Sequence, residues 1–318
     1  MDTQLVVGID IGGQTSKLGV VDARGTVLAQ TVIRTDTYSD VEPYIAELAD
    51  AVKKIISEAG AEGNVRGIGV GAPNGNYYTG SIENAVNIKW GNGRTIAFAE
   101  KLSEALGLPV ALTNDANAAA VGEMAYGAAR GMKNFIMITL GTGVGSGIVI
   151  NGDVVYGHDG YAGELGHVAA VRHNGRLCSC GKTGCLEAYC SATGVARTAR
   201  EWLELTEEPS TLRSVDNITS RDVYEAAKDG DALALRIFDF TGKMLGECCS
   251  DFVAFSAPEA IVFFGGLARA KEFLAKPIED AMNANVLPLW KNKVRVVFSQ
   301  LKESDAAILG ASALAWEL

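Results

Sequence analysis

A cluster of potential metal ligands lies in the middle of the sequence. Cys178, Cys180 and Cys185 fall within eight residues, and His167 and His173 precede them. Thiolates and imidazoles are the ligands that Zn²⁺ prefers, and four of them form a closed, structural site. Three free thiols so close together would have no other evident purpose. The sequence therefore predicts a structural zinc site formed by the three cysteines and one of the two histidines.

Two glycine-rich segments each follow an apolar run that is typical of a buried strand. The first contains Asp10, Gly12 and Gly13, and the second contains Thr142 and Gly143. Glycines allow backbone N–H groups to surround an anion closely. An aspartate at the end of a strand can hold Mg²⁺ through water. Either segment alone could be a tight hairpin turn, but two of them, one with an aspartate, favour a phosphate site.

A potential general base stands at the start of an alanine-rich segment that is expected to be a helix. Asp115 could accept a proton from a hydroxyl group while the hydroxyl oxygen attacks a phosphoryl group. The alternative is that Asn114 or Asp115 only caps the helix. Both can hold at once, because a helix N-terminus also attracts anions.

Hydrophobic periodicity indicates the elements that must position these residues. Strands are expected over 5–11, 17–22, 67–72 and 110–113, with helices over 41–56 and 97–106. Residues 135–155 repeat the opening plan of strand, glycine loop and strand. The repeat predicts a duplicated α/β fold with two lobes, residues 1–115 plus 304–318 and residues 116–303, each providing one glycine loop to a shared cleft. Further helices are expected over 189–205, 219–256 and 305–316, with a strand over 260–264.

Composition narrows the class of protein. The 318 residues carry a formal net charge of −10, which argues against a nucleic-acid partner because such binding relies on basic surfaces. No apolar run reaches the roughly 20 residues that span a bilayer. The sequence opens without a basic segment followed by an apolar one, so no secretory signal is expected. These features predict a soluble, cytoplasmic protein.

Seven short motifs together resemble those of the ROK family of bacterial sugar kinases and repressors, within the actin-like ATPase superfamily. The resemblance covers essentially the whole chain and implies a two-lobed actin-like (ribonuclease-H-like) ATPase fold with a deep cleft between the lobes and a zinc-binding loop. The motifs are Asp10-x-Gly-Gly, Gly71-Ala-Pro, Asn87-Ile-x-Trp90, Asn114-Asp-Ala-Asn-Ala-Ala-Ala-x-Gly-Glu123, Gly141-Thr-Gly-Val-Gly, Gly163-Glu-Leu-Gly-His167 and Cys178-x-Cys-Gly-x-x-Gly-Cys185-Leu-Glu187.

The resemblance also implies a role for each matching residue. Asp115 is expected to be the base that takes the proton from the primary hydroxyl of a sugar. Together with it, the sugar would be bound by Asn87, Asn114, Glu164, His167 and Glu187. Asp10 would hold Mg²⁺. The residues expected to bind ATP are Gly12, Gly13, Thr15, Thr142, Gly143, Gly265 and Gly266. The family pattern selects His167 rather than His173 as the fourth zinc ligand, with its other ring nitrogen directed to the sugar.

The implied activity is ATP-dependent phosphorylation of a hexose, with glucose as the leading substrate. The motifs are shared with kinases of N-acetylglucosamine and N-acetylmannosamine, so they leave these sugars open. The family's repressors carry a DNA-binding domain before the first strand, where this sequence has four residues, so a non-catalytic sugar-sensing regulator is the less favoured alternative. A homodimer is the family expectation. Three departures from the pattern are Gln14, where threonine is usual, and Asn74 and Ser146, where glycine is usual.

Overall fold

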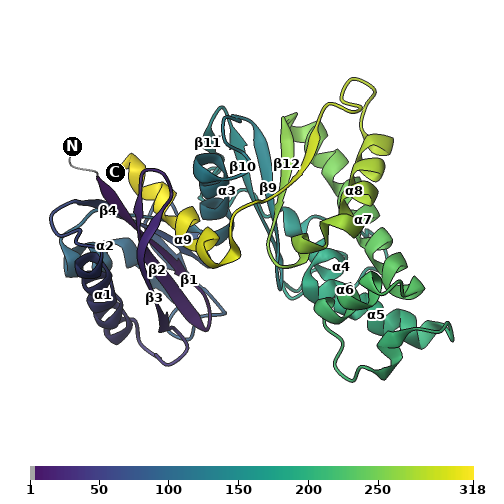
Figure 1. Ribbon diagram of the computed structural model, residues 1–318, viewed down its shortest axis with the longest axis horizontal. Coiled ribbons are helices and arrows are strands. Elements are labelled where there is room, and N and C mark those ends of the chain that lie inside the picture. The colour runs from purple at the N-terminus through teal and green to yellow at the C-terminus, as the bar shows by residue number, and fades with distance from the viewer. Residues whose placement is uncertain (1–3) are drawn as a thin grey trace. The chain divides into compact units, whose positions relative to one another are not determined.

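The computed structural model describes residues 4–318, apart from the side chains of 303–304, and divides the chain into two compact units (Figure 1). Unit 1 comprises Met1–Gly131, Val154–Ala162 and Gln300–Leu318, and unit 2 comprises Met132–Asp153 and Gly163–Ser299. The lobes expected from the sequence change at residues 115 and 303, whereas unit 1 continues through the helix that follows residue 115.

Unit 1 is built on a five-stranded sheet with the order β3-β2-β1-β4-β8. β1 pairs antiparallel with β2 and parallel with β4, which in turn pairs parallel with β8. The strands are β1 (Leu5–Ile11), β2 (Thr15–Asp22), β3 (Val27–Arg34), β4 (Val65–Ala72) and β8 (Val110–Asn114). A separate three-stranded sheet contains β5 (Gly75–Asn76), β6 (Ser81–Glu83) and β7 (Thr95–Ile96).

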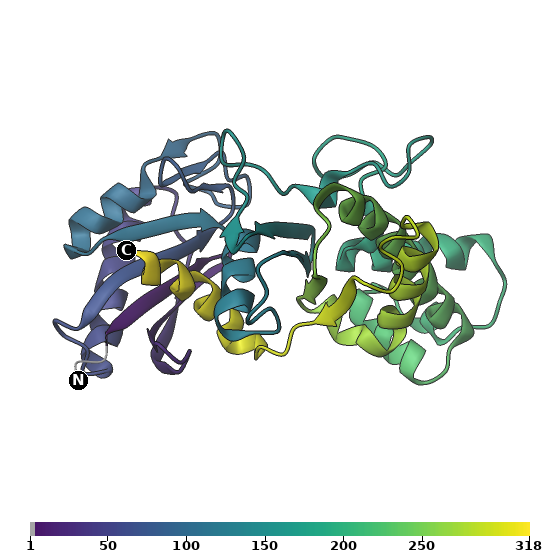
Figure 2. The ribbon, with the colours of Figure 1, turned by 90° about the horizontal axis from the view of Figure 1, so that it is seen from above.

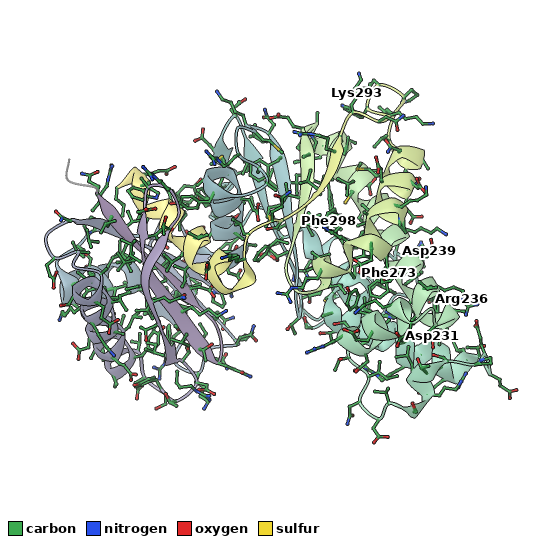
Figure 3. All side chains as sticks on the ribbon, viewed as in Figure 1. Asp231, Arg236, Asp239, Phe273, Lys293 and Phe298 are labelled. Carbon is green, nitrogen blue, oxygen red and sulfur yellow. The ribbon has the colours of Figure 1, made fainter. Side chains whose placement is uncertain are left out.

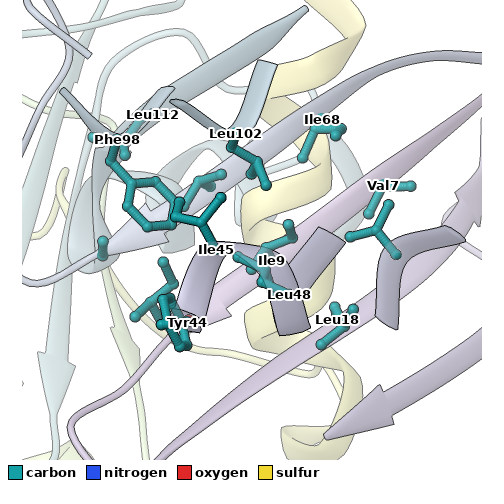
Figure 4. Packing of buried hydrophobic residues seen from close by; sticks show 14 of the residues in the cluster. Val7, Ile9, Leu18, Tyr44, Ile45, Leu48, Ile68, Phe98, Leu102 and Leu112 are labelled. Atoms are coloured by element: carbon teal, nitrogen blue, oxygen red, sulfur yellow. The ribbon is translucent and has the colours of Figure 1, made fainter. Parts of the chain in front are cut away.

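Helices cover both faces of the main sheet of unit 1. α1 (Val41–Glu58) and α2 (Phe98–Leu106) bury apolar residues against one face, where Ile45 and Leu48 pack with Ile9 and Ile68 (Figure 4). α3 (Asp115–Tyr126) and α9 (Glu303–Leu314) pack with each other, and α9 packs on β1 and β4. A short 3₁₀ turn, η4 (Ala315–Glu317), follows α9.

Unit 2 repeats the plan of unit 1. Its sheet has the order β11-β10-β9-β12-β13, in which β10 runs antiparallel to β9 while β12 runs parallel to both β9 and β13. The strands are β9 (Phe135–Leu140), β10 (Val144–Ile150), β11 (Asp153–Val154), β12 (Ala260–Phe264) and β13 (Arg295–Phe298). The duplicated plan predicted from the two strand–glycine loop–strand segments is therefore confirmed.

The helices of unit 2 gather on one side of its sheet, as Figures 1 and 2 both show. They are α4 (Glu187–Cys190), α5 (Ala192–Leu205), α6 (Ser220–Lys228), α7 (Ala232–Ser256) and α8 (Lys271–Asn285). Unit 2 also contains the 3₁₀ turns η1 (Leu165–His167), η2 (Thr211–Ser214) and η3 (Leu267–Ala270).

Two helices that the periodicity predicted as continuous are interrupted. Ser191 separates α4 from α5 and caps α5 by accepting a hydrogen bond from the backbone N–H of Gly194. Residues 229–231 separate α6 from α7, where Asp231 accepts hydrogen bonds from two backbone N–H groups at the start of α7 (Figure 3). Both breaks occur where a capping side chain offers the backbone an alternative to continuing the helix.

Within residues 4–318 the structure contains no helix long and apolar enough to span a membrane.

Close contact between α9 and the sheet of unit 1 depends on glycines in the strands. A Cβ atom on Gly8 would lie 2.1 Å from the carbonyl oxygen of Ile308, and one on Gly69 would lie 1.9 Å from that of Ala311. Helix backbone occupies the space that side chains would otherwise fill. Any side chain here would force α9 away from the sheet.

We expect Gly69→Ala to destabilise the protein by about 3 kcal/mol or more, because the added methyl group overlaps backbone that cannot rotate away. Urea denaturation measures the loss. Gly107→Ala is the matched control: Gly107 has a φ of 69° but open space around it, so only the left-handed backbone is penalised, at about 1 kcal/mol. Equal losses in the two variants would contradict the account.

Candidate active site

The predicted site residues of unit 1 meet at the carboxyl-terminal edge of its sheet. Asp10 on β1 is paired with Gly71 on β4, and Gly71 is paired with Thr113 on β8. Asn114 ends β8, and Asp115 is the first residue of α3. Because the three strands are parallel neighbours, the two aspartates approach each other across Gly71, which has no side chain to separate them.

Asp10 and Asp115 are electrostatically coupled. Burial, and to a lesser degree the charge of Asp115, raises the pKa of Asp10 to about 6. Asp115 is exposed at the surface, but many protein atoms surround its carboxyl group, and the resulting loss of hydration raises its pKa as well. Two carboxylates held close together favour a divalent cation, because the cation offsets their repulsion. Carboxylate oxygen is also the donor that Mg²⁺ prefers. Asp10 therefore fits the predicted Mg²⁺ role.

The capping role at the start of α3 falls to Asn114. Its Oδ1 accepts hydrogen bonds from the backbone N–H groups of Ala116 and Asn117, at 2.9 and 3.0 Å. Asp115 accepts one bond of 2.8 Å from Ala116 through Oδ1. A carboxylate offers about four acceptor positions, so Asp115 retains capacity to bind a hydroxyl group.

The first glycine loop packs against a predicted sugar-binding residue. The N–H of Gly12 donates to the carbonyl of Thr15 at 3.0 Å and closes the turn. A Cβ atom on Gly13 would lie 2.7 Å from the carbonyl oxygen of Asn87, so this close approach requires glycine. Gln14, one of the three departures, accepts a backbone hydrogen bond from Thr35 through its own carbonyl, an interaction that any residue type could make.

The second departure, Asn74, occupies a position that explains why glycine is usual there. Its φ of 52° lies in the left-handed region, which asparagine tolerates better than most residues. Its Nδ2 donates to the carbonyls of Glu83 and Asn84, at 2.9 and 3.1 Å. The side chain thereby ties its turn to the segment that leads to Asn87.

In unit 2, the second glycine loop joins β9 to β10. The N–H of Gly141 donates to the carbonyl of Gly143, and the hydroxyl of Thr193 on α5 donates to the carbonyl of Thr142, at 3.0 and 2.8 Å. Gly265, at the end of the neighbouring strand β12, has a φ of 105°, and a Cβ atom there would lie 2.6 Å from the carbonyl oxygen of Leu140. The structure thus brings the predicted ATP-binding glycines of unit 2 to one edge of its sheet.

The zinc ligands predicted from the sequence converge. The candidate ligand atoms of His167, Cys178, Cys180 and Cys185 all lie within 4.8 Å of one another. Sγ of Cys180 is 3.7 Å from Sγ of Cys185, and Sγ of Cys178 is 3.7 Å from Nδ1 of His167. A tetrahedral ion with Zn–S bonds of about 2.3 Å requires S···S separations of about 3.8 Å. The donor set and its spacing therefore fit Zn²⁺, with His167 rather than His173 as the nitrogen ligand.

Glu187 lies between the zinc cluster and the second glycine loop. Its Oε1 accepts a hydrogen bond of 2.8 Å from Ser179 and lies 3.5 Å from Sγ of Cys178. Its Oε2 accepts one of 3.0 Å from the N–H of Val144. Contacts from both sides fix this carboxylate, so the orientation of a predicted sugar ligand depends on the zinc loop and on β10 together.

Arg176 is a residue of this region that sequence reasoning did not identify as structural. Its side chain is about nine-tenths buried, and its guanidinium donates to Glu201 and Thr198 on α5 and lies 4.5 Å from the ring centroid of Tyr189. A buried arginine so fully paired anchors the zinc loop to α5. No motif pointed to this role, because it depends on a contact with a residue 25 positions away.

We expect Cys180→Ser to lower the Zn²⁺ affinity by more than about 100-fold, because a neutral hydroxyl replaces a thiolate ligand. Cys248→Ala, a buried cysteine outside the cluster, is the matched control and should retain one zinc per chain. Elemental analysis after dialysis measures the metal content, and thermal unfolding should show a lower Tm for Cys180→Ser. Wild-type protein without zinc would contradict the assignment.

Comparison with known proteins assigns nearly the whole chain to one protein family. The model of the ROK family matches residues 6–317. A glucokinase from Halalkalibacterium halodurans is 38% identical over 98% of this chain and 94% of its own length. A ROK family glucokinase from Streptomyces griseus, solved in complex with glucose and AMPPNP, is 33% identical with a TM-score of 0.79, covering 99% of this chain and 100% of that one.

A transcriptional regulator of the same family is also similar in structure. This homologue of the E. coli MLC protein is 27% identical with a TM-score of 0.87, and the match covers 99% of this chain and 78% of the regulator. The fold is therefore shared by kinases and regulators, and it does not by itself distinguish their activities. The chain belongs to the ROK family and has the actin-like ATPase fold of its members.

Proposed function

We propose that this chain is an ATP-dependent sugar kinase that phosphorylates glucose at its primary hydroxyl. The observation that carries the proposal is the Asp115 carboxylate, which is open to solvent and has a raised pKa beside Asp10. Similarity over nearly the full length to proteins named glucokinase supports glucose as the substrate.

In the proposed reaction, Asp115 accepts the proton of the primary hydroxyl as its oxygen forms a bond to the γ-phosphorus of ATP. The bond from that phosphorus to the oxygen bridging the β- and γ-phosphates breaks, and its electron pair leaves with ADP. A base is most effective when its pKa approaches the working pH. The raised pKa of Asp115 therefore suits this role, because the group is a stronger base than a free aspartate.

The other predicted residues hold the two substrates. We propose that Glu164 and Glu187 accept hydrogen bonds from sugar hydroxyls. His167, Asn87 and Asn114 would bind further hydroxyls as donors or acceptors. A metal on one ring nitrogen fixes the orientation and tautomer of a histidine, so zinc would leave Nε2 of His167 directed to the sugar. The glycine loops offer backbone N–H groups to the phosphates of ATP. Mg²⁺ held by Asp10 would offset the negative charge of those phosphates.

The substrate is tested by measuring ADP release with ATP, Mg²⁺ and a panel of hexoses that includes glucose, mannose, fructose, allose, N-acetylglucosamine and N-acetylmannosamine. We expect glucose to give the highest kcat/KM. A higher value for an N-acetylated hexosamine would retain the kinase and reject glucose. A protein that binds sugar but transfers no phosphoryl group would instead be a sugar-sensing regulator.

The base is tested with Asp115→Asn. We expect kcat to fall by about 10²- to 10⁴-fold, since an amide cannot accept the proton, while glucose binding measured by calorimetry changes little. For the wild-type enzyme, kcat/KM should decline as the pH falls through the raised pKa of Asp115, above the value of about 4 for a free aspartate. Asp216→Asn, at an exposed aspartate, is the control. A kcat near the wild-type value in Asp115→Asn would reject the base.

A further inference from the structure

The third departure from the family pattern, Ser146, makes hydrogen bonds that glycine cannot make. Ser146 lies on β10 and is 5% exposed. Its hydroxyl donates a hydrogen bond to the carbonyl of Gly163 and accepts one of 3.1 Å from the N–H of Leu165. These two partners are the residues immediately before and after Glu164, a predicted sugar ligand.

The same stretch of β10 holds this segment at a second point. A Cβ atom on Gly166 would lie 2.0 Å from the carbonyl oxygen of Val144, so the segment packs directly on the strand backbone. The N–H of Val144 also binds Glu187. The first residues of β10 thus contact the segments that carry two predicted sugar-binding carboxylates.

A direct contact between Ser146 and ATP does not fit this geometry. The hydroxyl is buried and has one donor and two acceptor positions. The donor is used for Gly163 and one acceptor for Leu165.

We propose that Ser146 is a positioning residue for sugar binding, which fixes the backbone around Glu164 and thereby the direction of its carboxylate. This inference rests on the proposed function, because Glu164 is a sugar ligand only if the protein binds a sugar. We expect Ser146 to affect the binding of the sugar and not the binding of ATP. Two hydrogen bonds at a buried position stabilise this arrangement, and glycine would provide neither.

The experiment compares Ser146→Ala with wild-type protein in steady-state kinetics with glucose and ATP varied separately. We expect the KM for glucose to rise about 5- to 30-fold, the range expected for loss of one or two buried hydrogen bonds. The KM for ATP should change less than about twofold. Ser146→Thr keeps the hydroxyl and should restore most of the glucose affinity, whereas Ser146→Gly should behave like Ser146→Ala.

Ser250→Ala is the matched control, because Ser250 is a buried serine of the same unit whose hydroxyl donates to the carbonyl of Glu247 in its own helix. Hydrogen–deuterium exchange provides a readout other than activity. Exchange of the peptide that covers residues 163–167 should accelerate in Ser146→Ala and remain unchanged in Ser250→Ala.

Two results would overturn the inference: an unchanged KM for glucose in an otherwise folded Ser146→Ala, or equal increases in the KM values for glucose and ATP. Failure of the proposed function is distinguishable from both, because it would appear in the wild-type protein as an absence of phosphoryl transfer to any hexose in the panel.

Discussion

The parallel alignment of β1, β4 and β8 is the constraint on which the candidate site of unit 1 depends. Each strand ends at the same edge of the sheet, so residues that are more than 100 positions apart in the sequence meet there. Gly71 keeps the space between Asp10 and Asp115 free of side chains. The cost of this arrangement is electrostatic, since burial and mutual repulsion raise the pKa of Asp10. A bound divalent cation would relieve that cost.

Unit 2 has the same sheet plan, but different chemical groups lie at the edge of its sheet. Its glycine turns after β9 and β12 present backbone rather than carboxylates, and its potential sugar ligands lie in segments without regular strands. Such segments need other restraints. The Arg176–Glu201 pair on α5 provides one, and the start of β10 provides a second. The predicted zinc site would provide a third.

Much of this architecture could be predicted from the sequence. The strand–glycine loop–strand repeat predicted two similar sheets, and the spacing of Cys178, Cys180 and Cys185 predicted their convergence. Other features could not be predicted, because they depend on tertiary contacts. The interruptions at Ser191 and at residues 229–231 are decided by caps that compete with apolar periodicity. The roles of Asn74 and Ser146 could not be predicted either, because in the sequence each residue is only a departure from a glycine pattern. Their hydrogen bonds reach residues 9 to 19 positions away.

The central claim is transfer of a phosphoryl group from ATP to the primary hydroxyl of glucose. The most direct test is ³¹P NMR of the product formed from glucose, ATP and Mg²⁺, recorded with proton coupling. We predict one phosphomonoester resonance split into a triplet by the two protons of a CH₂ group, formed in amounts equal to ADP. A doublet would place the phosphate on a CH carbon, and inorganic phosphate without a sugar ester would indicate hydrolysis. Either result would contradict the account.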